Sequence, residues 1–261
     1  MQNLRRPIEQ TDPPRPPKET LPTMYDLPSE NPEEPGLPDE FHYLQPQLLS
    51  ATLRLTRYSA DQVFSVGDMN LYYDSRHPYW YKRPDWFAVM GVPRLYDNRD
   101  MRLSYVVWQE GPSPFVVVEL LSPGTEKEDL GETQRGEDGI PTKWEVYEQI
   151  LRVPYYVVFD RYSNRFRAFH LVGGHYQALD VSNQRFLIPE WGLNLGIWQG
   201  IYQGIERSWL RWYNAAGELI LTDTEQLEAT ESRAVDAESR AERLAQQLRS
   251  LGIDPEDMSN L

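Results

Sequence analysis

Three ionisable residues lie where the local pattern calls for apolar ones. Asp85 opens an apolar run, Glu119 lies inside another, and Lys143 begins a helical stripe. A buried carboxylate is costly unless it is paired or holds a metal. Carboxylates can hold Mg²⁺, which lowers the pKa of a bound water and neutralises phosphate charge, while a lysine orients that water. The three residues therefore indicate the chemistry of a metal-dependent phosphodiesterase.

Two strands must position the two acids. The run from Phe115 to Leu121 is short, apolar and rich in β-branched residues between proline-containing turns, which predicts a strand buried on both faces. The run from Trp86 to Met90 predicts a second strand, with Asp85 at its start. If these strands are neighbours, Asp85 and Glu119 converge on one ion.

A helix must position the lysine. Thr142 and Glu145 form a Ser/Thr-x-x-Glu capping box after Pro141, which predicts a helix beginning at about Lys143. Lys143 lies one turn before Tyr147 on the apolar stripe of this helix. We therefore expect the lysine near the buried edge of the helix.

Four segments carry a resemblance to a known family: Arg83-Pro84-Asp85, the run from Val118 to Pro123, Lys143 with Tyr147, and the run from Tyr155 to Asp160. Together they resemble the bacterial Uma family of restriction endonucleases, within the PD-(D/E)XK nuclease superfamily. The resemblance covers roughly residues 60 to 180. It implies an α/β, restriction endonuclease-like core in which helices flank a central mixed β-sheet. It also implies hydrolysis of DNA phosphodiester bonds.

The resemblance assigns roles residue by residue. Asp85 matches the first acid of the motif and Glu119 the second, so these two are the expected ligands of Mg²⁺, with Mn²⁺ as an alternative. The superfamily pattern places its lysine two residues after the second acid, where this chain has Leu121. In the Uma family the lysine comes from the following helix, which implies Lys143 as the third catalytic residue.

Two further departures from the family concern spacing. Residues 130–142 resemble an insertion, because relatives place the residues comparable to Asp129 and Lys143 about one helical turn apart. The N-terminal acidic motif of the family is not recognisable, and Glu40 is a candidate for its role.

Each site residue also has an ordinary structural alternative. Asp85 could be a turn acid, Glu119 could pair with an arginine, and Lys143 could be a solvated residue of a first helical turn. Taken together and with the resemblance, we favour the metal site. Further acids could be ligands, although turn residues are the first interpretation: Asp68, Asp74 and Asp160.

The charge distribution neither requires nor forbids a nucleic-acid partner. The net charge is −14, but residues 1–40 hold 4 basic and 9 acidic residues, and residues 218–261 hold 4 basic and 11 acidic ones. The central segment is therefore close to neutral. DNA is the expected partner, although no basic patch supports it. The alternative function is an inactive nuclease fold that serves as an interaction scaffold.

Composition excludes several other classes of site. The chain has no cysteine, which excludes disulfides, thiolate zinc sites and cysteine nucleophiles. No apolar run approaches the roughly 20 residues of a membrane span, and the first residues lack the apolar stretch of a signal peptide. We therefore expect a cytoplasmic protein without a membrane partner.

The chain divides into five predicted parts. The first is rich in proline, with 10 of the 21 prolines in residues 1–40. The parts are a largely disordered arm (1–40), a restriction endonuclease-like domain (41–203), a β-hairpin (204–222), an amphipathic helix (223–252) and a tail (253–261).

The C-terminal helix carries a coiled-coil-like seam. Leu227, Ala234, Ala241 and Leu248 recur every seven residues, and Ala237, Leu244 and Leu251 each lie three residues further on. The seam could pair two chains as a homodimer or fold back on its own domain. We favour the homodimer.

Overall fold

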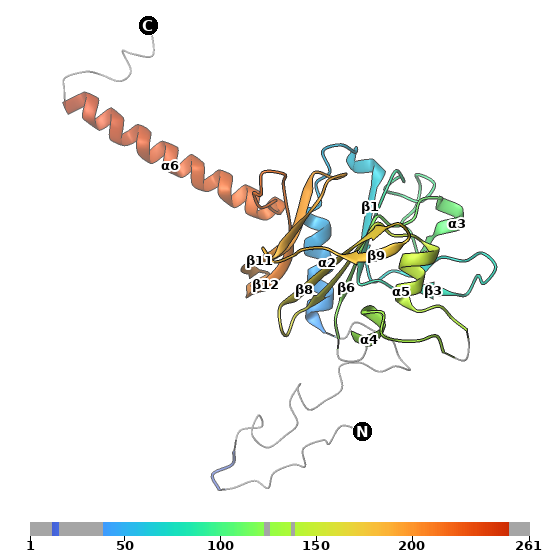
Figure 1. Cartoon of the computed structure of the whole chain (residues 1–261). Coiled ribbons are helices and arrows are strands. Elements are labelled where there is room, and N and C mark those ends of the chain that lie inside the picture. Colours follow the sequence, from blue (N-terminus) through green and yellow to red (C-terminus); the bar gives the residue numbers. More distant parts are fainter. Residues whose placement is uncertain (1–11, 16–38, 123–125, 137–138, 251–261) are drawn as a thin grey trace.

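The computed structural model describes residues 12–15, 39–122, 126–136 and 139–250 (Figure 1). Most of the predicted arm (1–40) and the whole predicted tail (253–261) lie outside these residues. Within the described part of the chain, no helix has the length and apolar character needed to cross a bilayer.

The core is a six-stranded mixed sheet. Its strand order is β1-β4-β6-β7-β8-β9; β6 and β7 pair in parallel and all other neighbours are antiparallel. The central mixed sheet expected of a restriction endonuclease-like fold is therefore confirmed. The strands are β1 (Val63–Gly67), β4 (Trp86–Met90), β6 (Val116–Leu120), β7 (Tyr155–Asp160), β8 (Arg165–Val172) and β9 (His175–Ala178).

One face of this sheet is covered by a helix and a second sheet. Helix α2 (Glu40–Thr52) lies between the central sheet and the sheet formed by β10 (Arg185–Ile188), β11 (Leu193–Tyr202) and β12 (Ile205–Tyr213) (Figure 1). Trp209 and Trp212 are buried against α2, and the Trp209 ring stacks on the Phe41 ring with their centroids 5.4 Å apart. The Trp212 indole donates to the Leu49 carbonyl oxygen over 3.0 Å.

The other face carries smaller elements. Helix α5 (Lys143–Glu145) continues as a π-helical turn, η2 (Val146–Ile150), and a three-stranded sheet contains β2 (Leu71–Tyr72), β3 (Tyr81–Lys82) and β5 (Tyr105–Val106). Successive β6 side chains alternate between the two faces, since neighbouring residues of a strand point in opposite directions. The short elements η1 (Ala60–Gln62), α3 (Val107–Glu110) and α4 (Glu126–Asp129) complete the domain.

The structure differs from the predicted elements near the C-terminus. Strand β12 pairs with β11 through a turn at Gln203 and Gly204, both with positive φ. Within the predicted hairpin (204–222) only a short pairing forms around the turn at 214–217, with one bridge between Tyr213 and Leu219 and the Ile220 N–H donating to the Trp212 carbonyl oxygen over 3.0 Å. The sequence missed the longer pairing of β12 with β11, because a Gln-Gly turn is a weak hairpin signal.

Helix α6 (Asp223–Ser250) projects away from the body of the protein (Figure 1). None of its residues, all of which the structure describes, is buried. Its first turn is anchored by the buried Arg211, whose guanidinium donates to both Glu225 carboxylate oxygens over 2.9 and 2.7 Å. The helix does not fold back on its domain, so that alternative is wrong for this structure.

A side chain closes the free edge of β12. The Gln45 amide donates to the Leu210 carbonyl oxygen over 2.9 Å and accepts from the Leu210 N–H over 2.8 Å, and all of these groups are buried. Gln45 thus replaces a neighbouring strand at this position. This exchange connects α2 to the second sheet by a pair of hydrogen bonds that an apolar residue cannot make.

Replacing Gln45 by leucine should therefore destabilise the fold. We expect Gln45→Leu to lower the free energy of unfolding by about 2–4 kcal/mol, because two buried backbone groups lose their partners. Gln47→Leu is the matched control; Gln47 is exposed on the same helix, and its replacement should change stability by less than about 0.5 kcal/mol. Urea unfolding of both variants measures the difference, and equal stabilities would mean that water satisfies the Leu210 groups.

Candidate functional site

The sheet brings Asp85 and Glu119 together. Strands β4 and β6 are antiparallel neighbours with Trp86 opposite Val118, so Asp85 and Glu119 are the next residues along the two strands. The Asp85 N–H donates to Glu119 Oε2 over 3.4 Å, and the Leu120 N–H donates to Asp85 Oδ2 over 2.6 Å. The expected proximity of the two acids is present. Asp85 accepts a hydrogen bond from the neighbouring strand β6, so it is not only a turn residue.

Lys143 reaches Glu119 from the helix and also contacts a third acid, Asp129. Its ammonium group donates to Glu119 Oε2 over 3.1 Å and to Asp129 Oδ1 over 2.7 Å, and its side chain is only 15% exposed. The predicted capping box sets the start of this helix, with Glu145 N–H donating to Thr142 Oγ1 and Thr142 N–H donating to Glu145 Oε2. The residues between Asp129 and the helix therefore do not displace the lysine. Glu119 pairs with a lysine, not with an arginine.

Asp129 is a member of this cluster that sequence reasoning missed. Its side chain is fully buried at the end of α4, and its Oδ2 atom has no hydrogen-bond partner among the described residues. The sequence identifies Asp129 only as the residue that precedes the insertion-like segment 130–142, and predicts no role for its side chain. A helix of four residues leaves no periodic signal, so the spacing to Lys143 in related proteins was the signal that could have identified it.

Tyr147 holds the other oxygen of Glu119. Its hydroxyl donates to Glu119 Oε1 over 2.8 Å, and its ring is buried. Lys143 and Tyr147 are one turn apart, so a single helical stripe binds both oxygens of the carboxylate. The sequence placed Tyr147 on the buried stripe but gave no role to its hydroxyl group.

His42 supports the cluster from the opposite face of the sheet. Its Nε2 lies 2.9 Å from the Leu120 carbonyl oxygen, and its Nδ1 lies 2.9 Å from Asp39 Oδ1. A carbonyl oxygen can only accept, and the Asp39 carboxylate also accepts, so both ring nitrogens carry protons. The backbone of Leu120 is therefore held at its carbonyl oxygen by the His42 imidazolium and at its N–H by Asp85.

The remaining acidic candidates lie outside the cluster. Asp160 accepts from the Tyr162 N–H and Asp74 from the Arg76 N–H, which are turn contacts. Asp68 pairs with Arg83 over 2.9 Å. Glu40 is exposed at the start of α2, and among the described residues it makes no contact with Glu119.

Burial dominates the electrostatics of the cluster. It raises the pKa of Glu119 well above its usual value and also raises the pKa of Asp85. Burial alone would lower the pKa of Lys143, but the charges of Glu119, Asp129 and Asp85 raise it well above its usual value. Lys143 therefore stays an ammonium ion, while one ammonium cannot neutralise three buried carboxylates.

The donor chemistry suits a hard divalent cation. Carboxylate oxygens are the protein ligands that Mg²⁺ uses most, and the unpartnered Asp129 oxygen is an acceptor without a donor. Within the described residues, however, no three acidic or imidazole groups are arranged to hold an ion as they stand. The Lys143 ammonium bridges Glu119 Oε2 and Asp129 Oδ1, so an ion that uses these two oxygens must displace it.

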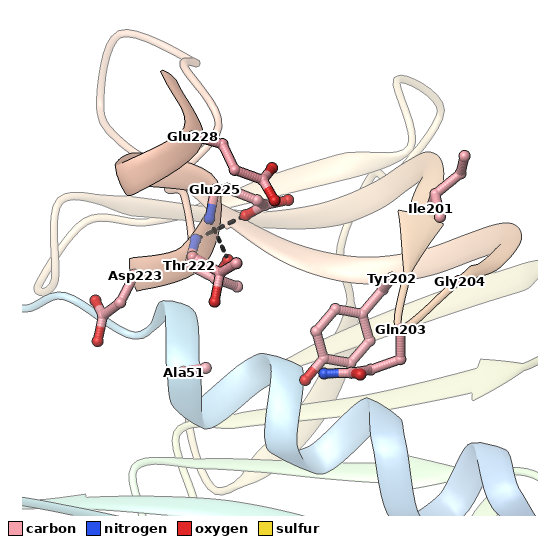
Figure 2. Close-up of a pocket in the computed structure, with 10 residues that line it drawn as sticks. Ala51, Ile201, Tyr202, Gln203, Gly204, Thr222, Asp223, Glu225 and Glu228 are labelled. Carbon is pink, nitrogen blue, oxygen red and sulfur yellow. Dashed lines mark hydrogen bonds between the residues drawn. The ribbon is translucent and has the colours of Figure 1, made fainter. Parts of the chain in front are cut away.

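Two basic residues near the cluster are already paired. Lys82 lies 3.2 Å from Glu128, and Arg135 lies 2.9 Å from Glu145. A pocket of about 600 Å³ lies elsewhere, where the β11–β12 turn and α2 meet the start of α6 (Figure 2). Acidic side chains line it, among them Glu225 and Glu228, so it is not a site for a phosphate backbone.

The imidazolium state of His42 can be tested through stability. Burial lowers its pKa, but the Asp39 hydrogen bond and the Asp85 charge raise it above its usual value. A raised pKa in the folded chain gives stability that is complete below about pH 6.5 and is lost as the pH rises through the folded-state value. The free energy of unfolding of the parent protein should exceed that of His42→Gln most near pH 6, by about 1.5–3 kcal/mol. The corresponding difference in Tm should shrink toward pH 9.

His175→Gln is the control for this measurement, because the His175 side chain is 81% exposed. It should change Tm little at any of these pH values. A Tm difference between the parent protein and His42→Gln that stays constant across the range would show that His42 is neutral in the folded chain.

Comparison with known proteins agrees with this geometry. Curated proteins give no match. A family model named Uma2, described as "Putative restriction endonuclease", matches residues 17–202, which is well over half of the chain and includes every residue of the cluster. The fold, a mixed α/β sheet followed by a C-terminal helix, is consistent with that family. The chain therefore belongs to the Uma2 family and has a restriction endonuclease-like fold.

Proposed function

We propose that this protein is a metal-dependent endonuclease that hydrolyses phosphodiester bonds of DNA. Family membership suggests nuclease function, and restriction endonuclease-like families usually use divalent metals. The observation that carries the proposal is the buried cluster in which Lys143 bridges Glu119 and Asp129 beside Asp85. So many charges in a fold core are costly, and catalysis is a reason to keep them.

In this proposal Asp85 and Glu119 hold Mg²⁺ or Mn²⁺, with Asp129 as a further oxygen donor. The ion, when bound, would lower the pKa of a water and neutralise phosphate charge. Tyr147 orients Glu119 by holding its Oε1 atom. Lys143 has a raised pKa, so it acts as a charged donor that orients the water or steadies the phosphate. It does not act as the base.

A non-catalytic scaffold on the same fold is the second candidate. The paired basic residues around the cluster favour it, since Lys82 and Arg135 must leave their acids before they can contact a phosphate. The acidic ends of the chain favour it as well. Under this alternative the cluster binds no metal and cleaves nothing.

We also propose that two copies of the chain associate through α6. The helix leaves all of its residues unburied in the single chain, including the leucines of its seam. An exposed apolar seam on a long helix is typical of a coiled-coil contact.

Cleavage should depend on the charge of Glu119. We expect plasmid DNA to be cut in Mg²⁺ or Mn²⁺ and not in EDTA, and Glu119→Gln to lower the rate by about a hundredfold or more, as loss of a group that stabilises transition-state charge does. Glu132→Gln is the control, because Glu132 is exposed between Asp129 and Lys143. Cleavage that survives in EDTA or in Glu119→Gln would rule out this site.

Replacing Lys143 should lower the rate of cleavage without abolishing metal binding. The parent protein should gain thermal stability from Mn²⁺ by mass action, and Glu119→Gln should lose this gain. Lys143→Met should keep it or increase it, because the ammonium competes with the ion for Glu119 and Asp129, yet its cleavage should fall about a hundredfold.

Lys127→Met, at an exposed lysine of α4, should retain both properties. A Mn²⁺ effect that is absent from the parent protein would favour the scaffold. Full cleavage by Lys143→Met would remove the lysine from the mechanism.

A further inference from the structure

The charges that flank the α6 seam are arranged by sign. The seam positions a and d hold Leu227, Thr230, Ala234, Ala237, Ala241, Leu244 and Leu248. Leu227 and Leu244 are 60% and 54% exposed in the single chain. On one flank, the e positions hold Glu231 and Glu238; on the other flank, the g positions hold Arg233 and Arg240.

This arrangement distinguishes the two ways in which two copies can pair. In a parallel pair, each g residue faces the e residue of the next heptad on the other helix, so Arg233 faces Glu238 of the partner subunit. In an antiparallel pair, g faces g and e faces e, which sets arginine against arginine and glutamate against glutamate. Among the described residues neither Arg233 nor Glu238 forms an ion pair within the chain. Both are therefore available for the parallel contact.

We propose that α6 forms a parallel, in-register, two-stranded coiled coil with α6 of a second copy of this chain. The inference rests on the association through α6 proposed above and does not depend on nuclease activity. The charge pattern identifies the partner, because the same helix supplies both the basic flank and the complementary acidic one.

The anchorage of α6 gives this pairing a structural consequence. Arg211 binds Glu225 through two hydrogen bonds and the Ile220 carbonyl oxygen over 2.7 Å, and Arg54 binds Asp223 over 2.8 Å. The first turn of the helix is thus joined to β12 and to the region after α2. A parallel pair places both domains at the same end of the coiled coil, with two Glu119 clusters in one particle.

Sedimentation equilibrium of the full chain tests the association. Alanine at three seam positions buries little area, so the protein should be studied up to about 0.5 mM, where even a Kd near 0.1 mM populates the dimer. A concentration-dependent rise to twice the chain mass is expected. A monomer throughout this range would overturn both the association and the parallel pairing, while leaving the nuclease proposal untouched.

Introduced cysteines test the direction of pairing, because the chain has none of its own. In a parallel pair, Ala234→Cys and Leu248→Cys should each form a disulfide with the same residue of the partner subunit. The two positions are about 21 Å apart along the helix, and a disulfide needs Cα atoms about 4.4–6.8 Å apart. A mixture of the two variants should therefore give no cross-product. Ser232→Cys, on the outer face, is the control and should not cross-link.

In an antiparallel pair, a positions face d positions, so Leu244→Cys completes the test. A disulfide formed only between Ala234→Cys of one chain and Leu244→Cys of the other would overturn the parallel pairing and leave the association standing. Charge exchange provides an independent test. Arg233→Glu should weaken the dimer about tenfold, since attraction becomes repulsion on both flanks. Adding Glu238→Arg should restore it. Failure of the double variant to recover would contradict the Arg233 to Glu238 contact, provided that circular dichroism shows an intact helix.

Discussion

The structure depends on one constraint, which is that a carboxylate lies in the middle of a buried strand. Glu119 has no exposed surface, and an unpartnered charge there would oppose folding. Lys143 and Tyr147 bind its two oxygens, and both come from one helix whose start is set by a capping box. The π-helical turn η2 that contains Tyr147 follows directly, and such turns are frequent at functional sites. The helix and the site are thus one structural unit.

The same constraint leaves the cluster short of positive charge when no metal ion is bound. Three buried carboxylates face one ammonium, so protons or a cation must supply the remaining positive charge. Basic residues nearby do not help, because Lys82 and Arg135 already have acidic partners. A substrate phosphate would have to compete with those acids. The positive charge of these two residues is therefore already held in ion pairs within the chain.

The sequence predicted the members of the buried cluster that lie in regular elements. An acid inside an apolar run and an acid at a strand start identified Glu119 and Asp85, and a capping box located Lys143. It could not predict Asp129 or His42 as parts of the site. Asp129 lies in a four-residue helix with no periodicity, and the partner of His42 is a backbone oxygen 78 residues away. Contacts of this kind depend on the packing of distant elements, which local patterns do not record.

The two backbone contacts of Leu120 have a mechanical consequence. His42 holds its carbonyl oxygen from the helix side of the sheet, and Asp85 holds its N–H. The two groups lie in the two planar peptide units that meet at the Leu120 Cα. A force applied to the first turn of α2 would therefore reach Asp85 across one residue of β6.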